Sequence, residues 1–416
     1  GIAPTVKRAV GQASGRVGIG SSRPFIGPFA GVAMEPITRT DDLAALCARL
    51  EGESFVTVDT EFMRDRTYWP KLCLVQIAGE HEAAAIDALA PDLDLTPLSE
   101  LINTPEPLKV MHAARQDLEI FWLLSGRLPS ALFDTQIAAM VCGFGEEVAY
   151  ETLVNKLAKA RLDKTSRFTD WSRRPLTAAQ LKYALGDVIH LRVIYRQLQA
   201  MIDKRRRTSW VYEETQGLLD PQLYEQPPEG AWKRLKLRSR DPRFIAIIQA
   251  LAAWRERKAQ SRDLPRNRVV RDDILLEIAA SRPMEGDSVR NLDRVSIDRQ
   301  SCDEVAAAVR EALAMPEDKL PQLPPPPSMP RGLGATVDLL RVLLKYRSDR
   351  SDVAQRLIAT TADLEAVAAD DDADVRLLKG WRRELFGEEA LALKHGELAL
   401  AIKNRKVEII KRHPEQ

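Results

Sequence analysis

The sequence predicts an α/β domain followed by a helical half, and three observations support this. Short β-branched or apolar runs occur between residues 55 and 111. Amphipathic helical patterns then continue to about residue 203, and every interpretable pattern beyond it is helical. A proline-rich stretch at 316–330 divides the helical half in two, because proline fixes the backbone and removes hydrogen-bond donors. Strands that come first and helices that interleave later favour a mixed sheet covered by helices.

The individual elements follow from local patterns. A helix is expected to open at Thr40, whose side chain can serve as its N-cap. The expected strands are 55–59, 72–77, 84–87 and 108–111. A helix follows the last strand directly, and a later helix opens at Thr177 after Pro175.

These patterns divide the chain into six segments. They are a disordered N-terminal extension (1–33), an α/β domain (34–205), a basic connector that contains prolines (206–240), a first helical bundle (241–315), a proline-rich linker (316–332) and a second helical bundle (333–416). The bundles look like weak repeats, since Trp254-Arg255 matches Tyr346-Arg347 and apolar positions match beyond them. Chance similarity between amphipathic helices is the alternative.

The composition excludes several classes of protein. A chain that is 45% hydrophobic and 29% charged is expected to be globular and soluble. No apolar run reaches the roughly 18 residues of a membrane-spanning helix. Four widely spaced cysteines without a C-x-x-C pair argue against a zinc knuckle or a disulfide framework and favour the cytoplasm. The glycine cluster at 15–20 follows no strand and has no Lys-Ser/Thr, so no nucleotide cofactor is expected.

The net charge of +1 conceals blocks of opposite sign. Residues 34–203 carry 18 basic and 25 acidic side chains, whereas residues 204–271 carry 17 basic and 8 acidic ones. An acidic block beside a basic block suits carboxylates that hold metal ions next to a surface that holds phosphate groups.

The sharpest local feature is Asp59-Thr60-Glu61 at the end of the first predicted strand. Residues two apart in a strand point to the same face, so the carboxylates of Asp59 and Glu61 should converge. Buried like charges are unfavourable without a cation, and oxygen ligands suit Mg²⁺ or Mn²⁺. Solvated acidic residues at a strand end are the ordinary alternative.

Three further residues lie at predicted helix positions. Asp117 follows the fourth strand near a helix start, where an acidic residue can simply offset the helix dipole. Tyr183 and Asp187 are four residues apart and so share one helical face, although they can equally serve packing and capping. Gly186 lies in the same helix, where glycine costs about 1 kcal/mol relative to alanine. Close approach of a strand or of a ligand would each explain it.

Taken together, Asp59, Glu61, Asp117 and Asp187 supply four carboxylates with Tyr183 beside the last. That set outlines a site for two divalent ions, Mg²⁺ or Mn²⁺, that would activate a water for in-line attack on phosphorus and stabilise the leaving oxygen. Tyr183 could orient the attacking water. No histidine base is needed, because metal coordination lowers the pKa of bound water.

The order D-x-E, then D, then Y-x-x-x-D resembles the tyrosine-containing branch of the DEDD superfamily of 3′→5′ exonucleases. Further motifs make the chain similar to the ribonuclease D family within that branch. These motifs are Asp59-Thr60-Glu61-Phe62, Tyr68-Trp69-Pro70-Lys71-Leu72-Cys73-Leu74-Val75-Gln76, His112-Ala113-Ala114-Arg115-Gln116-Asp117, Phe133-Asp134-Thr135-Gln136, and Leu162-Asp163-Lys164-Thr165 through Asp170-Trp171-Ser172-Arg173-Arg174-Pro175-Leu176. They cover about residues 36–200, and the helical remainder resembles HRDC modules.

The resemblance implies a ribonuclease H-like sheet in the first domain and two HRDC-like bundles after it. It also implies hydrolysis from an RNA 3′ end that releases 5′-mononucleotides, with tRNA precursors as the usual substrates. By the same resemblance, the four carboxylates would be the metal ligands, Tyr183 would position the water, and Asp134 would support the fold. A DNA-directed exonuclease of the superfamily and an inactive RNA-binding scaffold are the alternatives.

The basic block offers a surface for the RNA partner. Its residues are Lys233, Arg234, Lys236, Arg238, Arg240, Arg243, Arg255, Arg257, Lys258, Arg262, Arg266, Arg268 and Arg271, with Trp232 and Trp254 among them. A phosphate-binding face would make binding sensitive to salt, and a solvated helical surface is the alternative. We expect a monomer, because two helical modules could already complete a substrate channel.

Overall fold

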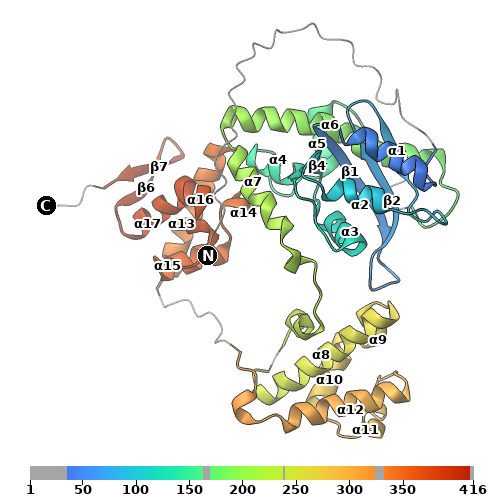
Figure 1. Cartoon of the computed structure of the whole chain (residues 1–416). Coiled ribbons are helices and arrows are strands. Elements are labelled where there is room, and N and C mark those ends of the chain that lie inside the picture. Colours follow the sequence, from blue (N-terminus) through green and yellow to red (C-terminus); the bar gives the residue numbers. More distant parts are fainter. Residues whose placement is uncertain (1–34, 163–168, 238, 324–331, 413–416) are drawn as a thin grey trace, which may run out of the picture. The chain divides into compact units, whose positions relative to one another are not determined.

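The computed structural model describes residues 35–162, 169–237, 239–323 and 332–412. The extension predicted to be disordered (1–33) lies outside the described residues, as does the part of the predicted linker at 324–331. The strands of the first domain are β1 (Phe55–Met63), β2 (Lys71–Ala78), β3 (Ala83–Ile86), β4 (Leu108–Met111) and β5 (Leu132–Asp134). They form one sheet in the order β3-β2-β1-β4-β5, antiparallel on the β2 side of β1 and parallel on the β4 side (Figure 1). The predicted mixed sheet is confirmed, and the short β5 adds a strand that the sequence patterns did not indicate.

Helices cover both faces of this sheet (Figure 1). They are α1 (Thr40–Leu50), α2 (Thr96–Asn103), α3 (Arg115–Ser125), α4 (Thr135–Val141), α5 (Tyr150–Leu153), which continues into a π-helical turn (Val154–Ala158), and α6 (Ala178–Arg205). Because side chains alternate along β1, Val56 and Val58 pack with α1, α2 and α3, whereas Phe55 packs with α4 and α6. The central strand therefore has a different helical layer on each side.

The long helix α6 is anchored near its start by contacts that include one beside β3, and in its middle by a contact with β1. Its first turn carries a capping box, in which Thr177 and Gln180 satisfy each other's backbone N–H groups. Just before it, Arg174 forms a bidentate ion pair with Asp87 after β3. In the middle, the buried Thr57 hydroxyl donates to the Val188 carbonyl at 2.8 Å. These contacts set the register of α6 on the sheet.

Asp134 at the end of β5 has the supporting role that was expected. Its buried carboxylate caps α4 by accepting hydrogen bonds from two backbone N–H groups at the start of that helix. It also accepts from the backbone N–H groups of Ala113 and Ala114, where Ala113 has a positive φ of 56°. One carboxylate thus shapes the turn that leads from β4 into α3.

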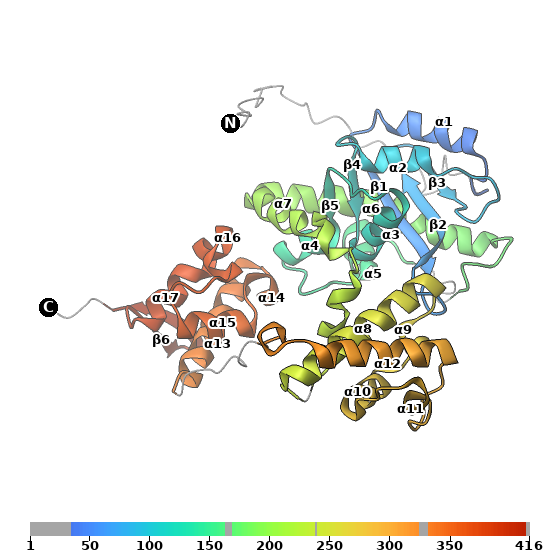
Figure 2. The same cartoon turned by 60° about the horizontal axis from the view of Figure 1, so that its bottom comes forward.

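Helix α7 (Thr208–Gln216) follows α6, and the rest of the described chain forms two modules. Short 3₁₀ turns lie at 217–219, 221–223 and 228–234 before the first module. That module contains α8 (Pro242–Arg262), α9 (Arg266–Val269), α10 (Asp272–Ser281), α11 (Gly286–Arg290) and α12 (Arg299–Ala314), and a 3₁₀ turn at 317–319 follows it. Figure 2 shows α10 and α12 beside α8, and their apolar faces share one core.

The second module begins with the same succession of elements. It contains α13 (Gly334–Ser351), α14 (Gln355–Ile358), α15 (Thr361–Ala369), α16 (Gly380–Arg382) and α17 (Glu388–Lys394), with a 3₁₀ turn at 376–378 and a π-helical turn at 383–387. In both modules a long helix ends at an aspartate in the left-handed conformation, Asp263 or Asp352, before a one-turn helix. Asp263 accepts hydrogen bonds from the β1–β2 loop, and Asp352 pairs with Arg205 at the end of α6. The two modules therefore use corresponding residues to contact the first domain.

The second module is not purely helical, which corrects the prediction of an all-α bundle. Strands β6 (Leu398–Lys403) and β7 (Lys406–Lys411) form an antiparallel hairpin. Its turn residues Asn404 and Arg405 both have positive φ, as a two-residue hairpin turn requires. The alternation of apolar and charged residues in β7 was the available signal, and α17 lies directly before it.

A buried ion cluster joins α7 to the second module. Glu214 of α7 accepts hydrogen bonds from Arg382 at 2.6 Å, from Arg376 and from the Trp381 indole. The ring of Trp210, also on α7, stacks on Trp381 with centroids 4.5 Å apart. Burial raises the pKa of Glu214, but the hydrogen bonds and charges of the two arginines outweigh it, so the pKa lies below the ordinary 4.5.

We expect Glu214→Gln to lower the free energy of unfolding by about 3–5 kcal/mol, because Arg382 would keep its buried charge without a counter-charge. Urea unfolding followed by far-UV circular dichroism measures this loss. The matched control is Glu213→Gln, which removes a half-exposed carboxylate 3.9 Å from the same arginine and should cost less than about 1 kcal/mol.

The same variant predicts a pH dependence with a definite sign. Since the folded pKa of Glu214 is depressed, its stabilising effect is fully present above pH 4.5 and is lost as the pH falls through the lower folded pKa. The difference in stability between the wild type and Glu214→Gln should therefore shrink below pH 4.5. A difference that stays constant into the acid range would contradict the ion cluster.

Candidate active site

Three of the four predicted carboxylates converge. One oxygen from each of Asp59, Glu61 and Asp187 lies within 4.8 Å of the others. Asp59 and Glu61 point from the same face of β1 as Thr57, and this is the face that α6 covers. The Thr57–Val188 hydrogen bond lies one residue beyond Asp187, so the contact that sets the register of α6 also brings Asp187 to the strand.

Asp117, the fourth predicted ligand, lies beside this group and is not part of it. It is buried in the first turn of α3, on the opposite layer of the sheet, and its Oδ1 accepts a hydrogen bond from the Thr60 hydroxyl. Thr60 faces α3 because it alternates with Asp59 and Glu61. Burial raises the pKa of Asp117, and the nearby charge of Asp59 raises it further. The structure thus brings three carboxylates together and places the fourth next to them, held by a threonine.

The electrostatics of the group are those of uncompensated like charges. Burial raises the pKa of Asp59 to about 6. Burial together with the charges of Asp59, Asp187 and Asp117 raises the pKa of Glu61 to about 9. Among the described residues, no lysine or arginine contributes to these shifts. Three carboxylate oxygens within one small volume form a donor set that fits a divalent metal ion.

A cavity of about 210 Å³ adjoins the carboxylates. Its lining includes Asp59, Asp187 and Tyr183, so the predicted water-positioning residue lines the same cavity as two of the carboxylates. The other lining residues used below are Tyr150 and His112. The cavity is the space in which a reacting group could lie next to the carboxylates.

Tyr150 is a site residue that the sequence did not single out. Its hydroxyl donates a hydrogen bond to the Asp187 carbonyl at 2.6 Å, with the Gly186 carbonyl 3.3 Å away. Its ring lies 5.5 Å from the ring of His112, whose Nδ1 is 3.0 Å from the Thr135 hydroxyl. No motif surrounds Tyr150, and a tyrosine at a helix start is normally a packing residue. Only its position shows that it supports the Asp187 backbone.

No described strand lies close to Gly186. A methyl group built on Gly186 would meet Leu162 Cδ2 at 3.8 Å and His190 Cδ2 at 4.0 Å, which are ordinary van der Waals distances. Of the two explanations left open by the sequence, the one that invokes a neighbouring strand is therefore not supported by the described residues.

Much of the predicted phosphate-binding face is occupied by internal pairs. The pairs are Arg255–Asp272, Arg257–Glu229, Lys258–Glu304, Arg262–Asp298, Arg266–Glu256 and Arg271–Asp273. Arg243 instead donates to the carbonyls of Leu313 and Met315, and Arg238 lies outside the described residues. Trp254 is buried in the core of the first module. The basic block thus stabilises the first module to a degree that its charge count did not indicate.

Comparisons with known proteins agree with this geometry. A family model described as a 3′-5′ exonuclease matches residues 34–203, and one described as the HRDC domain matches residues 245–301. The chain is 50% identical over 382 residues to ribonuclease D of Nitrobacter hamburgensis, covering 91% of this chain and 100% of the relative. It is 46% identical over 378 residues to ribonuclease D of Granulibacter bethesdensis, covering 90% and 96%. The crystal structure of Escherichia coli RNase D, described as an exoribonuclease involved in structured RNA processing, matches with a TM-score of 0.75 at 31% identity, covering 87% of this chain and 98% of that one.

Two further observations concern membrane-spanning helices and the cysteines. Across the described ranges, no helix has both the length and the apolar character needed to cross a membrane. Cys47, Cys73, Cys142 and Cys302 are all buried free thiols.

The pKa shift of Glu61 gives a prediction for the metal-free protein. Because the folded pKa is raised from 4.5 to about 9, the unfolded chain ionises first and wild-type stability falls as the pH rises through that window. Glu61→Gln removes this effect. We therefore expect the variant to equal the wild type below pH 4.5 and to exceed it by at least about 1 kcal/mol at higher pH. Thermal denaturation in EDTA across this pH range measures the difference.

Added Mg²⁺ or Mn²⁺ should close this gap by stabilising the wild type more than Glu61→Gln, because a cation that binds only the folded state adds to its stability. Glu311→Gln, at an exposed position of α12, is the control and should show neither effect. A wild type that gains no thermal stability from either ion would count against the metal site.

Gly186→Ala tests whether a methyl group fits beside Asp187, where it would make ordinary van der Waals contacts. Since no described atom blocks the new methyl group, alanine should fit and raise the free energy of unfolding by about 0.5–1 kcal/mol through its higher helix propensity. Chemical denaturation measures the gain. A loss of stability would show that the space is closed, whereas a stable variant that hydrolyses its substrate poorly would show that the substrate uses it.

Proposed function

Because the chain belongs to the ribonuclease D family of 3′→5′ exoribonucleases, we propose that it trims the 3′ ends of tRNA precursors and releases 5′-mononucleotides. The observation that carries the proposal is the convergence of Asp59, Glu61 and Asp187 beside Tyr183 in a chain that is 50% identical to a ribonuclease D over nearly its whole length. The DNA-directed exonuclease and the inactive scaffold become outcomes of the test below.

In the proposed mechanism, the carboxylates would hold two divalent ions, Mg²⁺ or Mn²⁺, and the side chains around the carboxylates would keep them in position. Asp59, Glu61 and Asp187, whose carboxylates lie close together, would be ligands, and Asp117 on the α3 side would be the fourth. Such ions activate a water and stabilise the leaving oxygen in phosphodiester hydrolysis. Tyr183 lines the same cavity, and we assign its hydroxyl the orientation of the attacking water.

The remaining residues of the site hold the ligands in position. The Thr57 hydroxyl donates to the carbonyl of Val188, the residue after Asp187, and the Tyr150 hydroxyl donates to the carbonyl of Asp187 itself. Thr60 orients Asp117. His112 shares a hydrogen bond with Thr135, and burial lowers its pKa, which makes its imidazole a weak proton acceptor. The proton of the attacking water is therefore assigned to solvent, not to a histidine.

We further propose that the modules after the nuclease domain hold RNA and brace the domain. The first module matches the HRDC family model, and the second shares its succession of helices and contacts α7 through Glu214. We also propose the boundaries of the six segments predicted from the sequence, a cytoplasmic location and a monomeric state.

The decisive test is incubation of the purified protein with a 3′-extended tRNA and with single-stranded DNA of the same sequence, in Mg²⁺ or in EDTA. Mononucleotide release from RNA should require Mg²⁺. It should fall by at least about 100-fold in Asp59→Asn and Asp187→Asn, since metal ions supply several kcal/mol of transition-state stabilisation. Chromatography of the products measures the rate and shows where the phosphate remains.

Tyr183→Phe is the conservative companion, because it removes only the hydroxyl. It should lower kcat while leaving KM for RNA nearly unchanged. Hydrolysis that survives EDTA or the aspartate variants would overturn the metal mechanism. Faster hydrolysis of DNA would favour the DNA-directed enzyme, and no hydrolysis of either would favour the scaffold.

A further inference from the structure

A second cavity, of about 540 Å³, is lined jointly by the nuclease domain and the first module. The nuclease domain contributes the β1–β2 loop and the start of α3, and the module contributes α8, α9 and the turn before them. Five arginines line it: Arg64, Arg115, Arg234, Arg255 and Arg266. We call it the arginine pocket. It is separate from the cavity beside the carboxylates, since no residue lines both.

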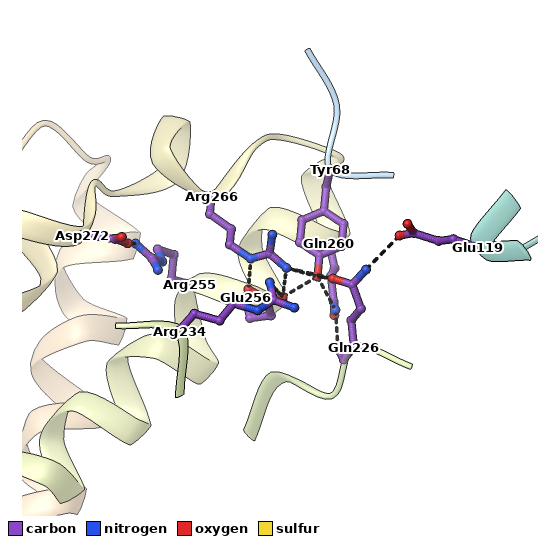
Figure 3. Close-up of polar contacts among 9 residues, drawn as sticks. All are labelled: Tyr68, Glu119, Gln226, Arg234, Arg255, Glu256, Gln260, Arg266 and Asp272. Carbon is purple, nitrogen blue, oxygen red and sulfur yellow. Dashed lines mark hydrogen bonds and ion pairs between the residues drawn. The ribbon is translucent and has the colours of Figure 1, made fainter. Parts of the chain in front are cut away.

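A hydrogen-bond network holds one wall of the arginine pocket in a fixed arrangement (Figure 3). The Arg266 guanidinium lies over the Tyr68 ring, 4.6 Å from its centroid, and donates to Glu256 through Nε and Nη2. The Tyr68 hydroxyl contacts Glu256 and Gln226, and Gln226 donates to Glu119. Both Tyr68 and Glu256 are buried, so the network is shielded from water. Arg266 therefore has little conformational entropy left to lose on binding a ligand.

The charges of the arginine pocket do not cancel pair by pair. Arg64, Arg266 and Arg255 are paired with Glu119, Glu256 and Asp272 in turn. The nearest acidic partner of Arg234 is Glu256, at 3.9 Å, and Glu256 already pairs with Arg266. The Arg234 side chain is 52% exposed. Arg115 is exposed and forms no hydrogen bond or ion pair within the described part of the chain. The remaining lining carboxylate, Glu225, is exposed and pairs with none of the five arginines.

The paired arginines also keep donors for a further acceptor. Arg64 contacts Glu119 through Nη2 alone, and Arg266 uses Nε and Nη2, which leaves N–H groups on both guanidiniums without an acceptor among the described residues. A planar guanidinium with free N–H groups is well suited to phosphate oxygens. The arginine pocket thus combines fixed donors with the two less engaged cations, Arg115 and Arg234.

Two arginines of the pocket lie close in sequence to carboxylates of the site. Arg64 follows Glu61 by three residues at the end of β1, and Arg115 precedes Asp117 by two residues in the first turn of α3. A polyanion whose end lies at the carboxylates would therefore pass close to these arginines. A phosphodiester is the group that RNA presents at every step along its chain.

We propose that the arginine pocket binds a backbone phosphodiester of the RNA substrate, upstream of the bond that is hydrolysed, with Arg115 and Arg234 as its principal binding residues. The proposal rests on the proposed function and adds a substrate-binding site contributed by both the nuclease domain and the first module. Bases are not read there, so binding is independent of sequence.

The test compares the wild type with Arg115→Ala, Arg234→Ala and the double variant on single-stranded RNA at several salt concentrations. Each substitution should raise KM about tenfold while kcat changes little, because a charge-assisted hydrogen bond to phosphate contributes about 1.5–3 kcal/mol. The slope of log KM against log salt should fall by about one unit for each lost phosphate contact. Arg39→Ala removes an exposed arginine before α1 and is the charge-matched control, for which both values should stay unchanged.

Direct binding separates failure of this inference from failure of the proposed function. Fluorescence anisotropy with labelled RNA in EDTA requires no hydrolysis. It should show weaker RNA binding by Arg115→Ala and Arg234→Ala and unchanged binding by Arg39→Ala. Folded variants, checked by circular dichroism, that bind RNA with wild-type affinity and wild-type salt dependence would overturn the arginine pocket as a phosphate site, even if the enzyme hydrolyses RNA. If no RNA is hydrolysed but binding weakens in Arg115→Ala and Arg234→Ala and not in Arg39→Ala, the proposed activity fails and the site stands.

Discussion

The confinement of three carboxylates to one small volume is the constraint on which the rest of the nuclease domain depends. Asp59, Glu61 and Asp187 repel one another, and among the described residues no cationic side chain compensates them. Their proximity must therefore be imposed by the fold, at a cost in stability that a bound cation would recover. The Thr57–Val188 hydrogen bond imposes part of it, because it fixes the register of α6 against β1.

Several buried carboxylates elsewhere among the described residues are paired with arginines, in contrast to this group. Glu214 and Asp87 are each buried against an arginine from a segment distant in sequence, and Glu256 is buried against Arg266 of the same module. The buried carboxylate of Asp134 is likewise compensated, because it accepts hydrogen bonds from backbone N–H groups of two segments. The carboxylates of the site and, with the opposite sign, Arg115 in the arginine pocket are charged groups without an ion pair among the described residues. A fold that leaves opposite charges at two neighbouring places is suited to a ligand that carries both metal-binding oxygens and a charged backbone.

The predictability of the site varied with the range of the interactions involved. The D-x-E pattern predicted the convergence of Asp59 and Glu61, because alternation along a strand is a local property. The position of Asp117 on the other side of β1 was not predictable, since it depends on which layer receives α3. Tyr150 left no signal at all, because its function is a single hydrogen bond to a backbone carbonyl 37 residues away. The β6–β7 hairpin had a local signal, and the helical patterns before it obscured it.

The mixed sheet, the helical half and the residue types of the site were all predictable from the amino-acid pattern, because periodicity and short motifs record local geometry. It also determined that basic residues concentrate at 204–271. Only the tertiary structure decided which of those charges remain available. Arg266 and Arg255 are engaged by acidic partners, whereas Arg115, from outside the basic block, has none among the described residues. The reason is physical: an ion pair depends on distance in space, and a charge count along the chain carries no information about that distance.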